Sequence, residues 1–70
     1  MKKKLKDPTS EQLKFVIKLY TEGQLHQALS HSIKMLEEFP NSAVLHNISG
    51  VCNAGLMQFD NAINSYKKAI

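Results

Sequence analysis

The sequence predicts an all-α protein made of two tandem helix-turn-helix hairpins. Three observations support this fold class: apolar residues recur every three or four positions, no segment alternates apolar and polar residues as a half-buried strand would, and turn-forming residues interrupt the pattern. The chain has 70 residues, of which 43% are hydrophobic and 21% are charged. This composition is typical of one small globular domain, and the length excludes large enzyme folds.

The first helix is predicted to begin just after Pro8. Thr9 and Gln12 have the spacing of a capping box, in which each side chain binds the other residue's backbone N–H. Asp7, directly before Pro8, is a competing cap. Gly23 interrupts the helical pattern. The apolar stripe between these signals consists of Leu13, Phe15, Val16, Ile17, Leu19 and Tyr20.

A second amphipathic helix is predicted to begin near Leu25. Pro40 marks its end, because proline lacks the backbone N–H that a continuing helix requires. Asn41 or Ser42 can then cap a third helix, which is expected over about residues 43–56.

A fourth helix is predicted after a turn at residues 57–58. Asp60 lies in its first turn, where the helix dipole favours a negative charge. We expect Ile63, Tyr66 and Ile70 to stay partly exposed, because a repeat hairpin buries its apolar side on a following unit. Self-association through this open helix is one way to cover them. The apolar positions that mark the face expected to be buried are Phe59, Ala62, Ile63, Tyr66, Ala69 and Ile70.

The two halves of the sequence follow the same plan at an offset of 34 residues, which is typical of tandem helical repeats. The corresponding pairs are Gln24 and Gln58, Leu25 and Phe59, Ala28 and Ala62, Leu29 and Ile63, and Lys34 and Lys68. We therefore expect a basic, flexible tail over residues 1–8, a first repeat over 9–42 and a second repeat over 43–70. The second repeat is expected to be truncated at its C-terminal end.

In this register, residues 9–70 resemble the tetratricopeptide repeat family, whose pattern is W-x₂-L-G-x₂-Y, then A-x₃-F, then P. The residues that match, several only in kind, are Phe15, Leu19, Ala28, Pro40, Gly50, Ala62 and Tyr66. Those that depart are Gln12, Val16, Ser32, His46, Ser49 and Asn53. Small residues are needed where helices cross closely, so we expect such crossings at Ala28, Gly50 and Ala62. The side chains expected to fill the space between helices are Phe15, Leu19, Phe59 and Tyr66.

The resemblance implies a fragment of a right-handed α-solenoid in which the first helix of each pair lines a concave face. On this basis we expect a non-catalytic module that binds a protein or peptide partner. The expected partner-binding residues are Leu13, Ile17, Tyr20, Thr21, Val44, Asn47, Val51 and Ala54. One alternative is that Leu13 and Ile17 pack on the N-terminal tail or a neighbouring chain. Another is that the chain is the N-terminal arm of a larger enzyme, a glycosyltransferase or sulfotransferase, whose catalytic domain it lacks.

The sequence predicts no catalytic residue, cofactor or metal site. His26 and His31 are five residues apart, which is about 140° around a helix, so they do not form an i, i+4 metal pair. Cys52 lies in no reactive motif and is expected to be a small packing residue. Gly50 is isolated from the other glycines, so no phosphate-binding loop is formed.

Charge and composition also limit the classes of partner that we expect. Four of the nine lysines lie in residues 1–6, and the rest of the chain has five lysines, six acidic residues and no arginine. Because arginine is the preferred reader of phosphates and guanines, we expect no nucleic-acid partner. No apolar run has the length of a membrane span, so we expect no membrane partner. One cysteine allows no internal disulfide, and we expect a cytoplasmic protein.

Overall fold

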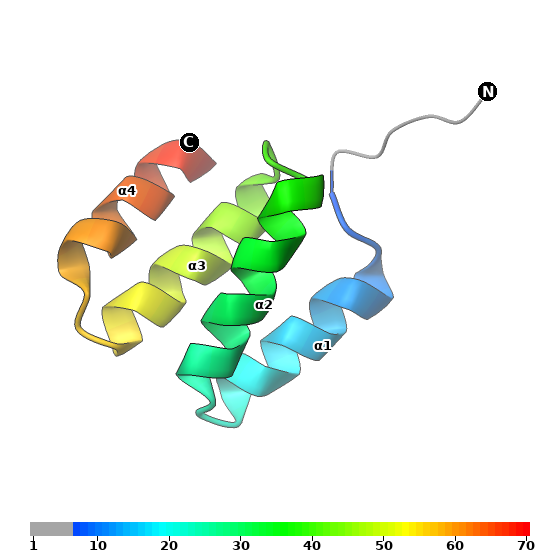
Figure 1. The fold of residues 1–70 in the computed structure, drawn as a ribbon, viewed down its shortest axis with the longest axis horizontal. Coiled ribbons are helices and arrows are strands. Elements are labelled where there is room, and N and C mark those ends of the chain that lie inside the picture. The colour runs from blue at the N-terminus through cyan, green and yellow to red at the C-terminus, as the bar shows by residue number, and fades with distance from the viewer. Residues whose placement is uncertain (1–6) are drawn as a thin grey trace.

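The computed structural model describes residues 7–70, and it has four helices and no strand within that range. The helices are α1 (Ser10–Thr21), α2 (Leu25–Glu38), α3 (Ala43–Gly55) and α4 (Phe59–Ala69). Each helix packs against the next one along the chain, so that α1 and α4 lie at opposite edges (Figure 1). The all-α prediction is therefore confirmed, and the packing is consistent with two helical hairpins. The first six residues of the expected tail lie outside the described range.

Side-chain caps begin α1 and α3. The Thr9 hydroxyl accepts a hydrogen bond from the Gln12 N–H at 3.2 Å, and the Gln12 side chain accepts one from the Thr9 N–H at 2.9 Å. This is the predicted capping box. The Ser42 hydroxyl caps α3 by accepting from the Leu45 N–H at 3.2 Å. The same hydroxyl donates to the Asp7 carboxylate at 2.6 Å, so Asp7 supports the α3 cap instead of capping α1.

Asp7 and Pro8 belong to the segment that the sequence assigns to the tail, yet both contact the folded part of the chain. Pro8 is buried. The bond from Ser42 to Asp7 joins residues that are 35 positions apart in the sequence. The Asp7 side chain therefore links the segment before α1 to the turn between α2 and α3.

The turns that close the two hairpins have the same backbone geometry. Gly23 and Met57, which are 34 positions apart, both have positive φ angles, of 81° and 64°. In each turn the following glutamine N–H bonds the carbonyl five residues earlier, from Gln24 at 2.9 Å and from Gln58 at 2.8 Å. These bonds form the Schellman motif that often ends a helix. The offset found in the sequence is therefore also present in the backbone.

The central cluster of the core draws side chains from three helices, and Leu45 of α3 is completely buried as well. Val16 of α1, Ala28 of α2 and Cys52 of α3 are completely buried and form one cluster. Ala62 of α4 is also buried. A Cβ added at Gly50 would lie 2.5 Å from Tyr66 Cε1, so α4 approaches α3 closely at that glycine. The predicted close approach is confirmed at Gly50, and Ala28 and Ala62 are buried, as close crossings at those positions require.

Two predictions about large apolar residues are wrong. Phe15 and Phe59 were expected to fill the space between helices, yet 51% and 58% of their surfaces are exposed. The expected buried face of α4 is covered only in part: Ala62 is buried and the Tyr66 ring packs against Gly50 of α3, as expected for a residue between helices. The other large side chains of that face are mostly exposed, namely Phe59, Ile63 and Ile70. The expected exposure of Ile63, Tyr66 and Ile70 is confirmed by that arrangement.

Candidate functional site

Four of the predicted partner-binding residues lie along α1. Leu13, Ile17, Tyr20 and Thr21 occupy one side of this helix, next to the buried Val16. Ile17 is 44% exposed and Tyr20 is 38% exposed, while Leu13 is half-buried. The core therefore takes up part of this side, and the remainder is available at the surface.

The other four predicted residues lie along α3, where Val44 and Asn47 are exposed and Val51 and Ala54 are half-buried. Both α1 and α3 pack against α2, and both contribute to the core cluster through Val16 and Cys52. Each set is therefore brought together on its own helix, and the two helices are joined by the shared core. We call these eight residues the α1–α3 face. The hollows described next are lined by other residues.

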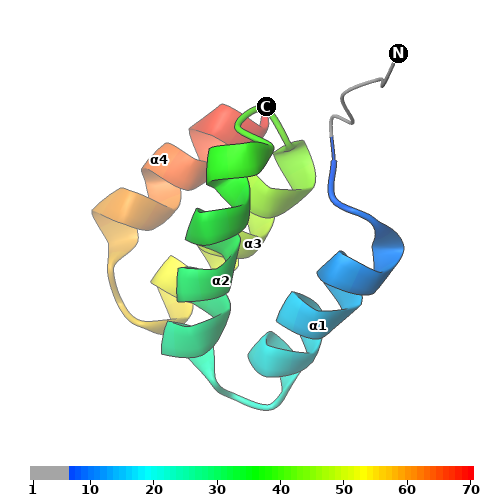
Figure 2. The same ribbon diagram turned by 45° about the vertical axis from the view of Figure 1, so that its right-hand side comes forward.

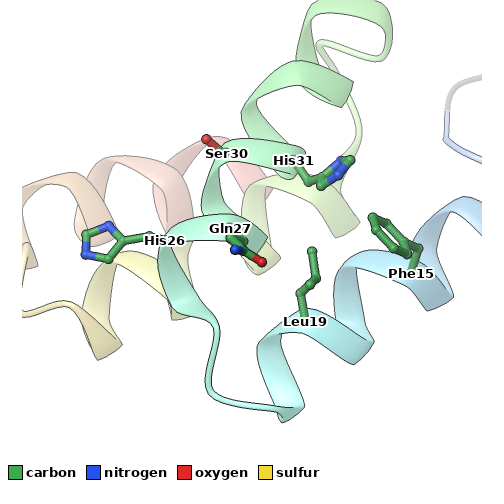
Figure 3. Close-up of a pocket in the computed structure, with 6 residues that line it drawn as sticks. All are labelled: Phe15, Leu19, His26, Gln27, Ser30 and His31. Carbon is green, nitrogen blue, oxygen red and sulfur yellow. The ribbon is translucent and has the colours of Figure 1, made fainter.

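A hollow of about 340 Å³ lies between α1 and α2 (Figure 3). The rings of Phe15 and His31 meet there edge to face, with centroids 4.8 Å apart and planes at 84°. Leu19 and Gln27 line the space between the two helices, while His26 points to the other side of α2. The lining residues are Phe15, Leu19, His26, Gln27, Ser30 and His31.

A second hollow of about 390 Å³ continues from the first towards the start of α1. It shares Phe15 and His31 with the first hollow and adds Glu11, Gln12 and Met35. Sequence reasoning missed this surface because it assigned Phe15 to the core. The available signal was the helical angle, since Phe15 and Leu19 lie on the opposite side of Val16 from Ile17.

A third hollow lies where the α2–α3 turn meets the end of α4. Its lining includes Leu36, Asn41 and Lys68. The His46 ring nitrogen Nε2 lies 2.9 Å from the Pro40 carbonyl oxygen, so Nε2 carries the proton that the carbonyl accepts. The His46 side chain therefore stabilises the turn that follows Pro40.

The reactive groups in the described part of the chain are few. Within residues 7–70, no three His, Cys, Asp or Glu side chains are grouped so that they could hold a metal ion. Burial raises the pKa of the Cys52 thiol above its ordinary value of 9.0, so the nucleophilic thiolate is disfavoured. The Ser49 hydroxyl is buried without a hydrogen-bond partner. None of the four helices has both the length and the apolar character needed to cross a bilayer.

No family model matches the chain, and no curated protein or solved structure matches it. Its two halves, however, are similar to each other. Besides the shared turn, α2 and α4 begin 34 positions apart, at Leu25 and Phe59. Ala28 and Ala62 are buried at corresponding positions of these helices. This internal repeat is the relation from which a function can be argued.

Proposed function

We propose that this chain is a non-catalytic protein-interaction module whose two tetratricopeptide-like hairpins form a fragment of an α-solenoid. The observation that carries the proposal is the repeated hairpin turn, with positive φ at both Gly23 and Met57 and the same backbone bonds around them. Paired helices that repeat at this spacing stack to form extended binding surfaces. The proposed binding surface is the α1–α3 face.

The chemistry of the α1–α3 face indicates the kind of partner. Its large accessible side chains are apolar or aromatic: Ile17, Tyr20 and Val44 each expose more than a third of their surface. Thr21 and Asn47 add hydrogen-bonding groups, and none of the eight residues is charged. Such a surface suits an extended peptide or an amphipathic helix with apolar anchors, which binds by covering these side chains.

The rest of the composition supports a protein partner in the cytoplasm. Residues 7–70 contain five lysines, six acidic residues and no arginine, so this part has none of the strong positive charge that phosphate backbones attract. The buried free thiol of Cys52 is typical of a protein kept in a reducing compartment.

Selection from a displayed library of random peptides, followed by NMR titration of the labelled chain, tests the proposal. We expect the selected peptides to shift the backbone resonances of Ile17, Tyr20, Val44 and Val51. Ile17→Glu and Val44→Glu each place a charge on the face and should weaken binding about tenfold or more.

The matched control is Ile33→Glu on α2. Ile33 is 51% exposed and lies outside the α1–α3 face, so its substitution should leave peptide affinity unchanged. Resonance shifts confined to Phe15, His31 and Met35 would instead assign binding to the α1–α2 hollow and overturn the proposed site. Failure to select any peptide that binds the folded chain would overturn the proposed function.

A further inference from the structure

A row of large apolar side chains runs along α4, and the ring of its most buried member, Tyr66, packs against Gly50 of α3. Phe59, Ile63, Tyr66 and Ile70 are spaced by four, three and four residues, which places them along one line of the helix. Their exposed fractions are 58%, 51%, 36% and 105%. We call these four residues the α4 seam. In both ribbon views α4 lies at the edge of the molecule away from α1 (Figures 1 and 2).

The charges beside the α4 seam are arranged by sign. Asp60 follows Phe59 in the first turn of α4, and Lys67 follows Tyr66 in the last turn, so both lie on the same flank of the seam. The other flank carries Ala62, which is buried against the rest of the fold. The flank that carries Asp60 and Lys67 is therefore negative near the start of α4 and positive near its end.

We propose that a second copy of this chain docks on the α4 seam, with the two α4 helices antiparallel and related by a two-fold axis. In this arrangement Phe59 lies level with Ile70 of the second copy, and Ile63 lies level with its Tyr66. Asp60 then faces Lys67 of the second copy, and the symmetry repeats this ion pair. Such an interface is closed, because each copy uses the same surface once.

Charge complementarity selects this occupant and this orientation. A two-fold axis between parallel α4 helices would put the two charged flanks on opposite sides of the interface, where Asp60 and Lys67 of one copy would have no opposite charge to meet. The antiparallel arrangement keeps both charged flanks on the same side of the interface, so each Asp60 faces Lys67 of the other copy. It also covers the four seam side chains, whose spacing is that of an apolar coiled-coil seam.

The proposed dimer is independent of the proposed peptide-binding function. The α4 seam and the α1–α3 face share no residue, so either surface can be occupied without the other. One helix pair buries much less than the roughly 1,600 Å² of a standard protein interface, so we expect a weak, concentration-dependent dimer.

Sedimentation equilibrium of the 70-residue chain over about two decades of concentration tests the dimer, because association responds to mass action. We expect the wild-type chain to shift from monomer to dimer. Ile63→Glu should reduce the association constant by about tenfold or more, whereas Ile33→Glu, at an equally exposed position, should not. A chain that stays monomeric, or association lost in Ile33→Glu but kept in Ile63→Glu, overturns the proposal.

Charge substitutions test the proposed ion pairs. Lys67→Asp should weaken association, because it faces Asp60 of the second copy with a like charge. Lys68→Asp is the matched control, because it makes the same charge change at the neighbouring residue, which lies off the flank that carries Asp60 and Lys67. Asp60→Lys should also weaken self-association, and mixing it with Lys67→Asp should restore a mixed dimer. Equal effects of Lys67→Asp and Lys68→Asp would contradict the pairing.

Disulfide cross-linking in a Cys52→Ala background tests the orientation. Phe59→Cys and Ile70→Cys should cross-link to each other when mixed, and neither should cross-link to itself. The reason is distance: in an antiparallel pair the two copies of either position are about 16 Å apart, beyond the reach of a disulfide. Cross-linking of Phe59→Cys with itself would show a parallel pair and overturn the proposed orientation. Circular dichroism of every variant confirms that the helices are retained.

Discussion

Gly23 and Met57 make the same left-handed turn with different side chains. Glycine adopts a positive φ without steric cost, whereas the Cβ of methionine crowds the backbone there. The Met57 side chain is 77% exposed, so it gains little packing in return. The second hairpin therefore retains local strain that the first hairpin avoids.

Met57→Gly is expected to raise the free energy of unfolding by about 0.5–1 kcal/mol, because it removes that strain. Gly23→Ala should lower the free energy of unfolding by about 1 kcal/mol. Nothing lies within 4 Å of the added Cβ, so this cost is conformational alone. Urea denaturation of the two variants measures both changes. A destabilised Met57→Gly variant would show that the turn is not strained.

Cys52 should make stability depend on pH in the alkaline range. Burial raises its pKa in the folded state above 9.0, so the folded chain holds the thiol proton where the unfolded chain releases it. The free energy of unfolding should therefore fall as pH rises above about 9, which is the unfolded value. Below that pH the thiol is protonated in both the folded and the unfolded state, so it does not change how the free energy of unfolding depends on pH.

Urea denaturation of the wild type and Cys52→Ala at about pH 8 and about pH 10 isolates this effect, because the two proteins differ only at the thiol. The alanine variant should be less stable at the lower pH, since it loses packing in the core. The difference between the two proteins should shrink at the higher pH. A constant difference would mean that the thiol ionises equally in the folded and unfolded states.

At the scale of a single element, α3 depends on how its first turn is capped. The Ser42 hydroxyl is buried and has two roles, since it accepts from the Leu45 N–H and donates to Asp7. Thr9 caps α1 with the same chemistry in an exposed position. The two caps therefore differ in how much polar surface is left unsatisfied when the hydroxyl is removed.

Ser42→Ala is expected to lower the free energy of unfolding by about 2 kcal/mol, and Thr9→Ala by about 1 kcal/mol. Thermal or urea denaturation of the two variants gives the comparison. Asp7→Ala is the control, because it removes the bond to Ser42 and leaves the cap itself. A larger loss of unfolding free energy in Thr9→Ala than in Ser42→Ala would show that the Ser42 cap is not the more important of the two.

At the scale of the whole molecule, the central core cluster joins three of the helices. Val16, Ala28 and Cys52 come from three helices, and each is completely buried. A larger side chain at Ala28 must push α1 and α3 away from α2 at the same time. The packing of the first hairpin on the second therefore depends on the size of this one residue.

Ala28→Leu is expected to lower the free energy of unfolding by about 1–3 kcal/mol through overpacking. Ala43→Leu provides the control at an exposed position in the first turn of α3, where a change within about 0.5 kcal/mol is expected. Urea denaturation compares them, and amide exchange would show whether α1 loosens first. Equal stability of the two variants would contradict a tight three-helix core.

Local sequence signals predicted where the helices begin and end better than they predicted which side chains lie at the surface. Helix starts at Thr9 and Ser42 follow from capping groups within three residues, and Gly23 ends a helix by its own backbone preference. The position of Phe15 could not be predicted in this way. A helical period shows that a side is apolar, but the neighbouring helix determines which part of that side it covers.

The sequence by itself determined the helices, their order and the 34-residue repeat, because caps, turns and periodicity act over a few residues. Only the tertiary structure decided which apolar side chains reach the surface. Phe15, Phe59 and Ile63 remain exposed because α1 and α4 pack through Val16 and Ala62, which are smaller and allow close contact. It also decided that Asp7 holds Ser42, a contact between residues too far apart in the sequence for any local pattern to predict.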